Sequence, residues 1–130
     1  MIHRTLGLLV LCGLMATVSL QAHHSIAGVY NVKKTEKAQG TIVNVKFTNP
    51  HGAMSIEVKN PADGTAKVWV LTTGSANVLA NLGISANGPN TVKAGDLVDF
   101  TYYPAINGSN LGFLRSITLP NKKEVEFEIQ

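Results

Sequence analysis

Cysteine is almost absent from this chain: of 130 residues, only Cys12 is a cysteine. Cys12 lies inside an apolar N-terminal run, residues 6–18, which we expect to be removed from the working protein. What remains then has no disulfide, no thiolate metal site and no cysteine nucleophile. Its fold has to be held together by the core alone.

Motifs of common enzymes are also missing. The sequence has no paired carboxylates at catalytic spacing, no Gly-x-Ser-x-Gly elbow and no nucleotide-binding glycine motif. Its serines have no evident His-Asp relay. Two acids, Asp96 and Asp99, are explained by a turn and by an outward strand position. The sequence therefore predicts a binding protein rather than an enzyme.

The first 22 residues have the pattern of a secretory signal. Arg4 supplies the positive charge, the apolar run follows, and the small residue Ala22 precedes the expected cleavage site. The run is shorter than the roughly 20 residues of a membrane span, and no other segment is a spanning candidate. We therefore expect a cleaved signal peptide over 1–22, a periplasmic or secreted location, and no membrane span after cleavage. Cleavage after Gln21 or Ser19 is the alternative.

Removal of the signal leaves about 108 residues, one domain of ordinary size over 23–130. Losing Arg4 leaves 10 of the 11 basic residues against 8 acids, a net charge of +2. The lysines are scattered apart from two pairs, at 33–34 and 122–123. This balance is typical of a solvated surface and argues against nucleic acid as a partner.

Alternation of apolar and polar residues predicts a mainly β protein. Strands are expected at residues 41–48, 54–59, 65–72, 97–103 and 111–119, with an edge strand at 124–129. In the first strand we expect Val43 and Val45 on the apolar face, and in the third we expect Val68 and Val70 to share a face. One short helix is expected at 75–82, with Ser75 as its N-cap and Gly83 after its end.

Three strands, a helix and two more strands is the order of an OB-fold. We therefore expect an OB-fold-like, five-stranded, partly open Greek-key barrel with one short helix between its third and fourth strands. The alternative is an immunoglobulin-like β-sandwich, which needs more strands and no helix.

Histidines gather where a metal site could form. After cleavage three remain: His23 and His24 at the new N-terminus, and His51 in the turn 49–52. Imidazole suits copper, zinc, nickel and iron, and affinity for nitrogen ligands peaks at Cu(II) in the divalent series. A terminal amine is deprotonated easily by a metal, because its pKa is only about 7.7–8.0. We therefore expect copper at these three histidines.

The cleavage position decides the chemistry of that site. A chain starting at His23 offers its amine and one ring nitrogen, with His24 or His51 as a third nitrogen ligand. A chain starting at Ala22 has His23 in second position and His24 in third. A histidine in third position, together with a free terminal amine, chelates Cu(II) or Ni(II) in a square plane. A cut after Ser19 leaves two ordinary histidines on a tail, and a polar chain start without metal is the competing interpretation.

A second candidate site is an aromatic groove. Trp69, Tyr102 and Tyr103 could line a ligand groove, and Asn107 lies in the loop joining the last two main strands, which OB-folds often use for ligands. The competing interpretation places the three aromatic residues in the core. This groove would serve a small ligand, a glycan or a periplasmic protein partner.

A set of motifs resembles a known family. The motifs are Ala-His-His-Ser at 22–25, Thr-Asn-Pro-His at 48–51, Gly-Ser-Ala-Asn at 74–77, Lys-Ala-Gly-Asp at 93–96, Asn-Gly-Ser-Asn at 107–110 and Arg-Ser-Ile-Thr-Leu at 115–119. The chain resembles a family of small secreted bacterial proteins classed only as a domain of unknown function. The resemblance implies that His23, His24 and His51 belong to one site. Members of that family usually have one aromatic residue after His-His-Ser and another shortly before Asn-Pro-His. In this chain Ile26 takes the first position, and Phe47 is the aromatic residue near the second.

The sequence thus predicts a small periplasmic protein that binds a transition metal, most readily copper, as a carrier, buffer or accessory module. The alternative is a non-metal ligand- or protein-binding OB-like module.

Overall fold

The computed structural model describes residues 26–128, so the expected signal peptide and His23 and His24 lie outside the described residues. The elements follow the chain as α2 (Ile26–Val29), β1 (Glu36–Lys46), β2 (Ala53–Lys59), β3 (Ala66–Thr72), α3 (Ala76–Asn81), β4 (Leu97–Pro104), β5 (Leu111–Thr118) and β6 (Glu124–Glu126). None of the helices in this part of the chain has the length and apolar character needed to span a bilayer.

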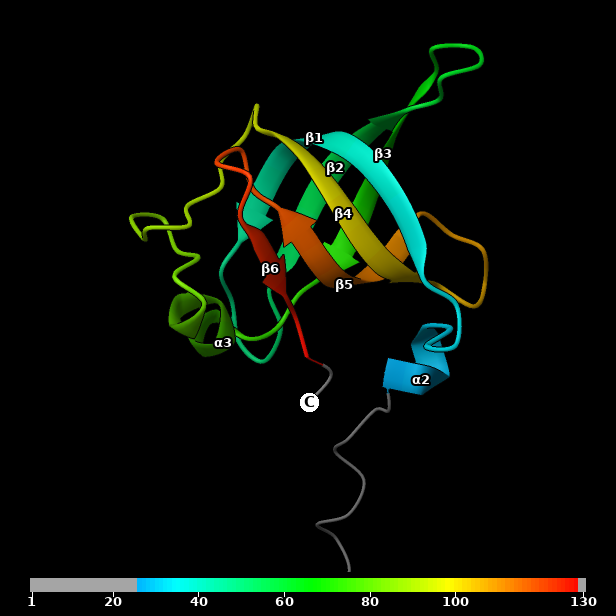
Figure 1. Cartoon of the computed structure of the whole chain (residues 1–130). Coiled ribbons are helices and arrows are strands. Elements are labelled where there is room, and N and C mark those ends of the chain that lie inside the picture. Colours follow the sequence, from blue (N-terminus) through cyan, green and yellow to red (C-terminus); the bar gives the residue numbers. More distant parts are fainter. Residues whose placement is uncertain (1–25, 129–130) are drawn as a thin grey trace, which may run out of the picture.

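The strands form a closed barrel of five strands (Figure 1). Their order is β3-β2-β1-β4-β5-β6, and a parallel pairing of β3 with β5 joins the two sides. All other pairings are antiparallel, and β6 extends β5 at its free edge. This arrangement confirms the OB-like barrel, with α3 between β3 and β4 as expected. The barrel is closed rather than partly open, and it is not a sandwich.

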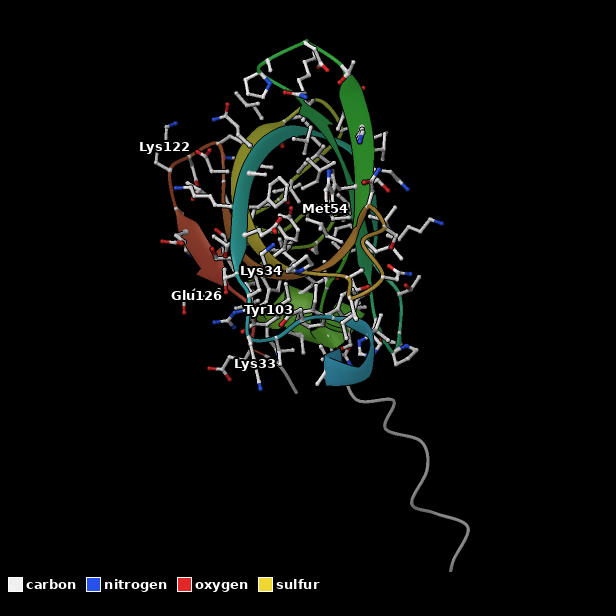
Figure 2. All side chains as sticks on the ribbon, turned by 90° about the vertical axis from the view of Figure 1, so that its right-hand side faces the viewer. Lys33, Lys34, Met54, Tyr103, Lys122 and Glu126 are labelled. Atoms are coloured by element: carbon white, nitrogen blue, oxygen red, sulfur yellow. The ribbon has the colours of Figure 1, made fainter. Side chains whose placement is uncertain are left out.

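The barrel interior is filled by apolar side chains from every strand, and Figure 2 shows Met54 among them. The largest fully buried ones include Phe100, Phe127, Ile42, Met54, Ile56, Leu71, Leu79, Ile84, Leu114 and Ile117. Leu79 comes from α3, whose N-cap Ser75 accepts a hydrogen bond from the Val78 N–H. Helix α3 thus contributes a buried side chain to the core, and its expected position is confirmed.

The face of β1 differs from the expected one because the strand contains a bulge. Its pairing with β2 shifts register between Ile42 and Asn44, which leaves Val43 as the extra residue. Ile42 is therefore buried while Val43 is 47% exposed, and Val45 returns to the core side. Strand β1 also begins at Glu36, well before the expected start, because its first half pairs with β4.

In β3, Val68 and Val70 share a face as expected, and that face is the outward one. Val68 and Val70 are 46% and 37% exposed, whereas Leu71 is fully buried and Trp69 packs against the core. Strand β3 has apolar residues on both faces, so alternation alone cannot choose the inward one. The edge strand β6 agrees with expectation, because Val125 and the following Phe127 are buried.

Candidate functional site

His51 lies in the β1–β2 loop, which is fastened to the start of α3. The Thr48 hydroxyl donates to the His51 carbonyl at 2.8 Å. The Ala76 N–H donates both to the Asn49 side-chain oxygen and to the Thr48 carbonyl, each at 3.1 Å. These bonds use the otherwise unpaired N–H at the helix start to hold the loop in one place. The Asn-Pro-His sequence is therefore a helix-docking loop as well as the carrier of His51.

Gly52, the residue after His51, is also held in place by backbone hydrogen bonds. Its N–H donates to the Gly74 carbonyl, and its carbonyl accepts from the Thr73 N–H, both at 3.0 Å. A side chain here would meet the Thr73 hydroxyl at 2.6 Å and the Lys46 carbonyl at 2.7 Å. Only glycine allows this close approach, so the loop and the residues before α3 form one unit with an exposed His51 beside them.

The segment that follows His24 is docked onto the same molecule. Tyr30 bonds through its hydroxyl to that of Thr72 at 2.7 Å, and its ring lies 6.0 Å from that of Phe113. The Ile106 N–H donates to the Val29 carbonyl at 3.0 Å. Figure 1 shows α2 and α3 at the same lower end of the barrel. The barrel therefore holds the segment at Val29 and Tyr30, a few positions after the paired histidines.

A small cavity of about 40 Å³ brings this segment and His51 together. It is lined by Ile26, Pro50, His51, Gly74, Ser75, Val78, Phe113 and Glu128. A water needs roughly 10–15 Å³ of such space, so the cavity has room for an ion with a water. Ile26 lies only two positions after His24, so the described chain starts at the wall of the cavity that His51 lines.

Glu128 is a lining residue that the sequence did not single out. The buried Phe127 anchors the end of the chain, because its N–H donates to the Arg115 carbonyl and its own carbonyl accepts from the Arg115 guanidinium, each at 2.8 Å. Glu128 follows this anchor and remains exposed. Alternation places it on the outward side of an edge strand, and the sequence has no local signal that the C-terminal end reaches the β1–β2 loop.

Within residues 26–128 no group of three or more His, Cys, Asp or Glu is arranged to hold a metal ion. Of the expected metal ligands, His51 is in this range, and the structure places it in a cavity with one carboxylate residue, Glu128. A complete ligand set at this cavity would therefore need donors beyond those that residues 26–128 supply.

The four expected groove residues are not all in one place. Trp69 lines a groove of about 340 Å³ with Asn31, Lys34, Glu36, Pro104, Ala105, Ile106, Gly108 and Ser109. Tyr102 is buried and its ring lies 5.1 Å from that of Trp69. Tyr103 instead lies under the Arg115 guanidinium, and Asn107 accepts two hydrogen bonds from Ser109 within its own turn. Trp69 and the β4–β5 loop thus belong to a groove, while Tyr103 and Asn107 have structural contacts.

A hydrogen-bonded chain of polar groups adjoins this groove. The Lys34 ammonium pairs with one Glu36 oxygen, and the Tyr102 hydroxyl donates to the other at 2.9 Å. These two hydrogen bonds, with that of Lys34 the stronger cause, hold the pKa of Glu36 below its ordinary value. Burial, together with the Glu36 carboxylate, raises the pKa of Tyr102 far above its usual range. Glu36 is therefore held ionised and Tyr102 neutral at physiological pH.

Comparison with known proteins gives a family without an assigned activity. No curated protein and no solved structure matches the chain. A family model described as a family of unknown function, DUF6152, matches residues 10–115. The match covers most of the chain, including the β1–β2 loop and α3, and ends before Glu128. The chain belongs to the family of unknown function DUF6152.

Proposed function

We propose that this protein is a small periplasmic binding protein that holds Cu(II) at the cavity beside His51. The observation that carries the proposal is that Ile26 and His51 line the same cavity. An extended residue spans about 3.3–3.6 Å, so His24 starts within about 7 Å of Ile26 along the chain. The paired histidines are thus close enough along the chain to this cavity to bind the same metal ion as His51.

The available donors favour Cu(II) among transition metals. The imidazole of His51 and the carboxylate of Glu128 are nitrogen and oxygen donors, and a chain starting at His23 adds an amine and further imidazoles. Soft sulfur donors are not available to the site, because Met54 is fully buried in the barrel and Cys12 precedes the proposed cleavage site. Nitrogen-rich sites bind Cu(II) most strongly in the divalent series. A site without sulfur also favours Cu(II) over Cu(I), which prefers soft ligands.

Carrying or buffering copper is the role that this site serves best. His51 is exposed, and the cavity is lined from α2, the β1–β2 loop and the start of α3, with Glu128 beside them. An accessible site lets a metal be received from one partner and passed to another. We therefore assign the protein a role as a copper carrier, buffer or accessory module, without a catalytic step.

The first test is to find the N-terminus of the exported protein and then to titrate it with Cu(II). Mass spectrometry of protein purified from the periplasm should give a chain that starts at His23. Calorimetry with a Cu(II)–glycine solution should then show one equivalent bound, because glycine competes away weak surface sites. Losing one nitrogen ligand in His51→Ala should weaken binding by roughly 100-fold or more. Binding that is equally tight in His51→Ala contradicts the proposal.

Two further changes to the protein test the terminal amine and the Glu128 carboxylate separately as ligands. Acetylating the terminal amine of His23 removes the amine ligand while keeping every side chain, and it should weaken Cu(II) binding strongly. Glu128→Gln should weaken it by about tenfold, the effect expected for one peripheral oxygen donor. Glu126→Gln is the matched control, since Glu126 is exposed, lies two positions away and does not line the cavity. Equal effects of the two glutamine variants would remove Glu128 from the site.

A further inference from the structure

The groove beside Trp69 is separate from the proposed copper cavity and shares no lining residue with it. It opens between the connection from α2 to β1, strand β3 and the β4–β5 loop, and Lys34 marks that connection in Figure 2. Its volume of about 340 Å³ lies within the range of small-molecule sites, about 300–1,000 Å³. The groove is therefore large enough to hold a small organic molecule.

The aromatic wall of the groove is held in place. Trp69 is half-buried, and the Tyr102 ring lies against it at 5.1 Å with a tilt of 55°. Tyr102 in turn contacts the buried Phe100 at 5.6 Å. A fixed indole provides a flat apolar surface without the entropy cost of ordering a mobile side chain. Such a surface suits a ligand that has one flat or gently curved C–H face.

The polar wall of the groove carries balanced charge. Lys34 and Glu36 neutralise each other as an ion pair, so they offer hydrogen-bond donors and acceptors without attracting an ion. Asn31 adds an amide that can donate and accept, and Ser109 adds a hydroxyl oxygen that can accept, since its proton is donated to Asn107. A ligand that fits this wall carries several neutral groups that both donate and accept hydrogen bonds.

We propose that this groove binds a neutral saccharide. A sugar ring has an apolar C–H face for the indole and a rim of hydroxyl groups for the polar wall. A charged sugar gains nothing from the paired Lys34 and Glu36, and it must give up hydration to enter. The β4–β5 loop, which contributes Gly108 and Ser109, is at a position that OB-folds use for oligosaccharides. The proposal does not depend on copper binding, because it uses different residues.

The chain offers a direct readout, since Trp69 is its only tryptophan. We suggest titrating the mature, metal-free protein with maltotriose and with chitotriose as neutral probes while recording tryptophan fluorescence. Trigalacturonic acid and the fully deacetylated glucosamine trimer serve as negatively and positively charged counterparts of the same length. We expect a saturable change with at least one neutral probe, and binding of both charged sugars at least tenfold weaker. No saturable change with either neutral probe, up to its solubility, overturns the proposal, as does equal binding of a charged sugar.

A matched pair of variants tests the location. Asn31→Ala removes a groove residue and should weaken binding about tenfold, the effect of losing one or two hydrogen bonds. Asn121→Ala is the control, because both asparagines accept a hydrogen bond from the backbone two residues later and only Asn31 lines the groove. Melting temperatures check that both variants fold. Equal binding by Asn31→Ala and Asn121→Ala places the saccharide elsewhere and contradicts the proposal.

Discussion

Individual side chains both stabilise this barrel and form its proposed binding sites. Glu36 accepts hydrogen bonds from Lys34 and Tyr102, and it joins the start of β1 to β4. Tyr102 in turn supports Trp69. The glutamate is one-third exposed, so solvent screens its ion pair, while the bond from the buried Tyr102 is better protected. The hydrogen bond from Tyr102 therefore matters more to the fold than the ion pair does.

Glu36 makes the stability of the metal-free protein depend on pH. Its pKa is lower in the folded protein than its ordinary value of 4.5. Its contribution is therefore complete above that value and is lost as pH falls through the folded pKa. We expect the difference in melting temperature between the wild type and Glu36→Gln to be largest near neutral pH and to shrink as the pH falls below 4.5. A difference that stays constant or grows on acidification contradicts this account.

The pKa shift of Tyr102 has the opposite sign to that of Glu36. Its pKa is raised on folding, so its contribution is complete below the ordinary value of 10.0 and is lost as pH rises above it. Acid therefore weakens the hydrogen bond of this pair by protonating Glu36, and strong alkali weakens it by deprotonating Tyr102.

At the scale of elements, β3 offers the sharpest test of the fold. Leu71→Ala should lower the free energy of unfolding by about 2–5 kcal/mol, because Leu71 is fully buried between β2 and β5. Val70→Ala, one position earlier, should cost less than about 1 kcal/mol because Val70 is 37% exposed. Urea unfolding of both variants measures the difference. A larger cost for Val70→Ala would mean that the strand faces the other way.

The elements show how far the sequence specifies the fold. Most strands and α3 could be predicted, because turns with glycine and proline separate runs of clear alternation. The inward faces of β1 and β3 could not be predicted fully. In β1 the bulge at Val43 changes the phase of the alternation partway along the strand. In β3 both faces are apolar, and only the pairing with β2 and β5 decides that Leu71 is buried.

At the scale of the whole molecule, the barrel brings together parts of the chain that are far apart in sequence. The sequence predicted a common site for His23, His24 and His51, and the fold places Ile26 and His51 at one cavity. Glu128 could not have been predicted, because its position depends on where β6 leaves the barrel. Of the groove residues, Trp69 could be predicted from its type. Lys34 and Glu36 could not, because they line the groove from the connection before β1 and from the first residue of β1, which starts earlier than the alternation predicts.

The central claim, that Cu(II) is bound at the cavity beside His51, is tested most directly by pulsed electron paramagnetic resonance. The sample is the mature chain starting at His23 with one equivalent of Cu(II), compared with its His51→Ala variant. Modulations from the remote nitrogen of a coordinated imidazole count the histidine ligands. We predict that the wild type has one more coordinated imidazole than His51→Ala. Identical modulation patterns in the two proteins would show that His51 is not a ligand and would contradict the account.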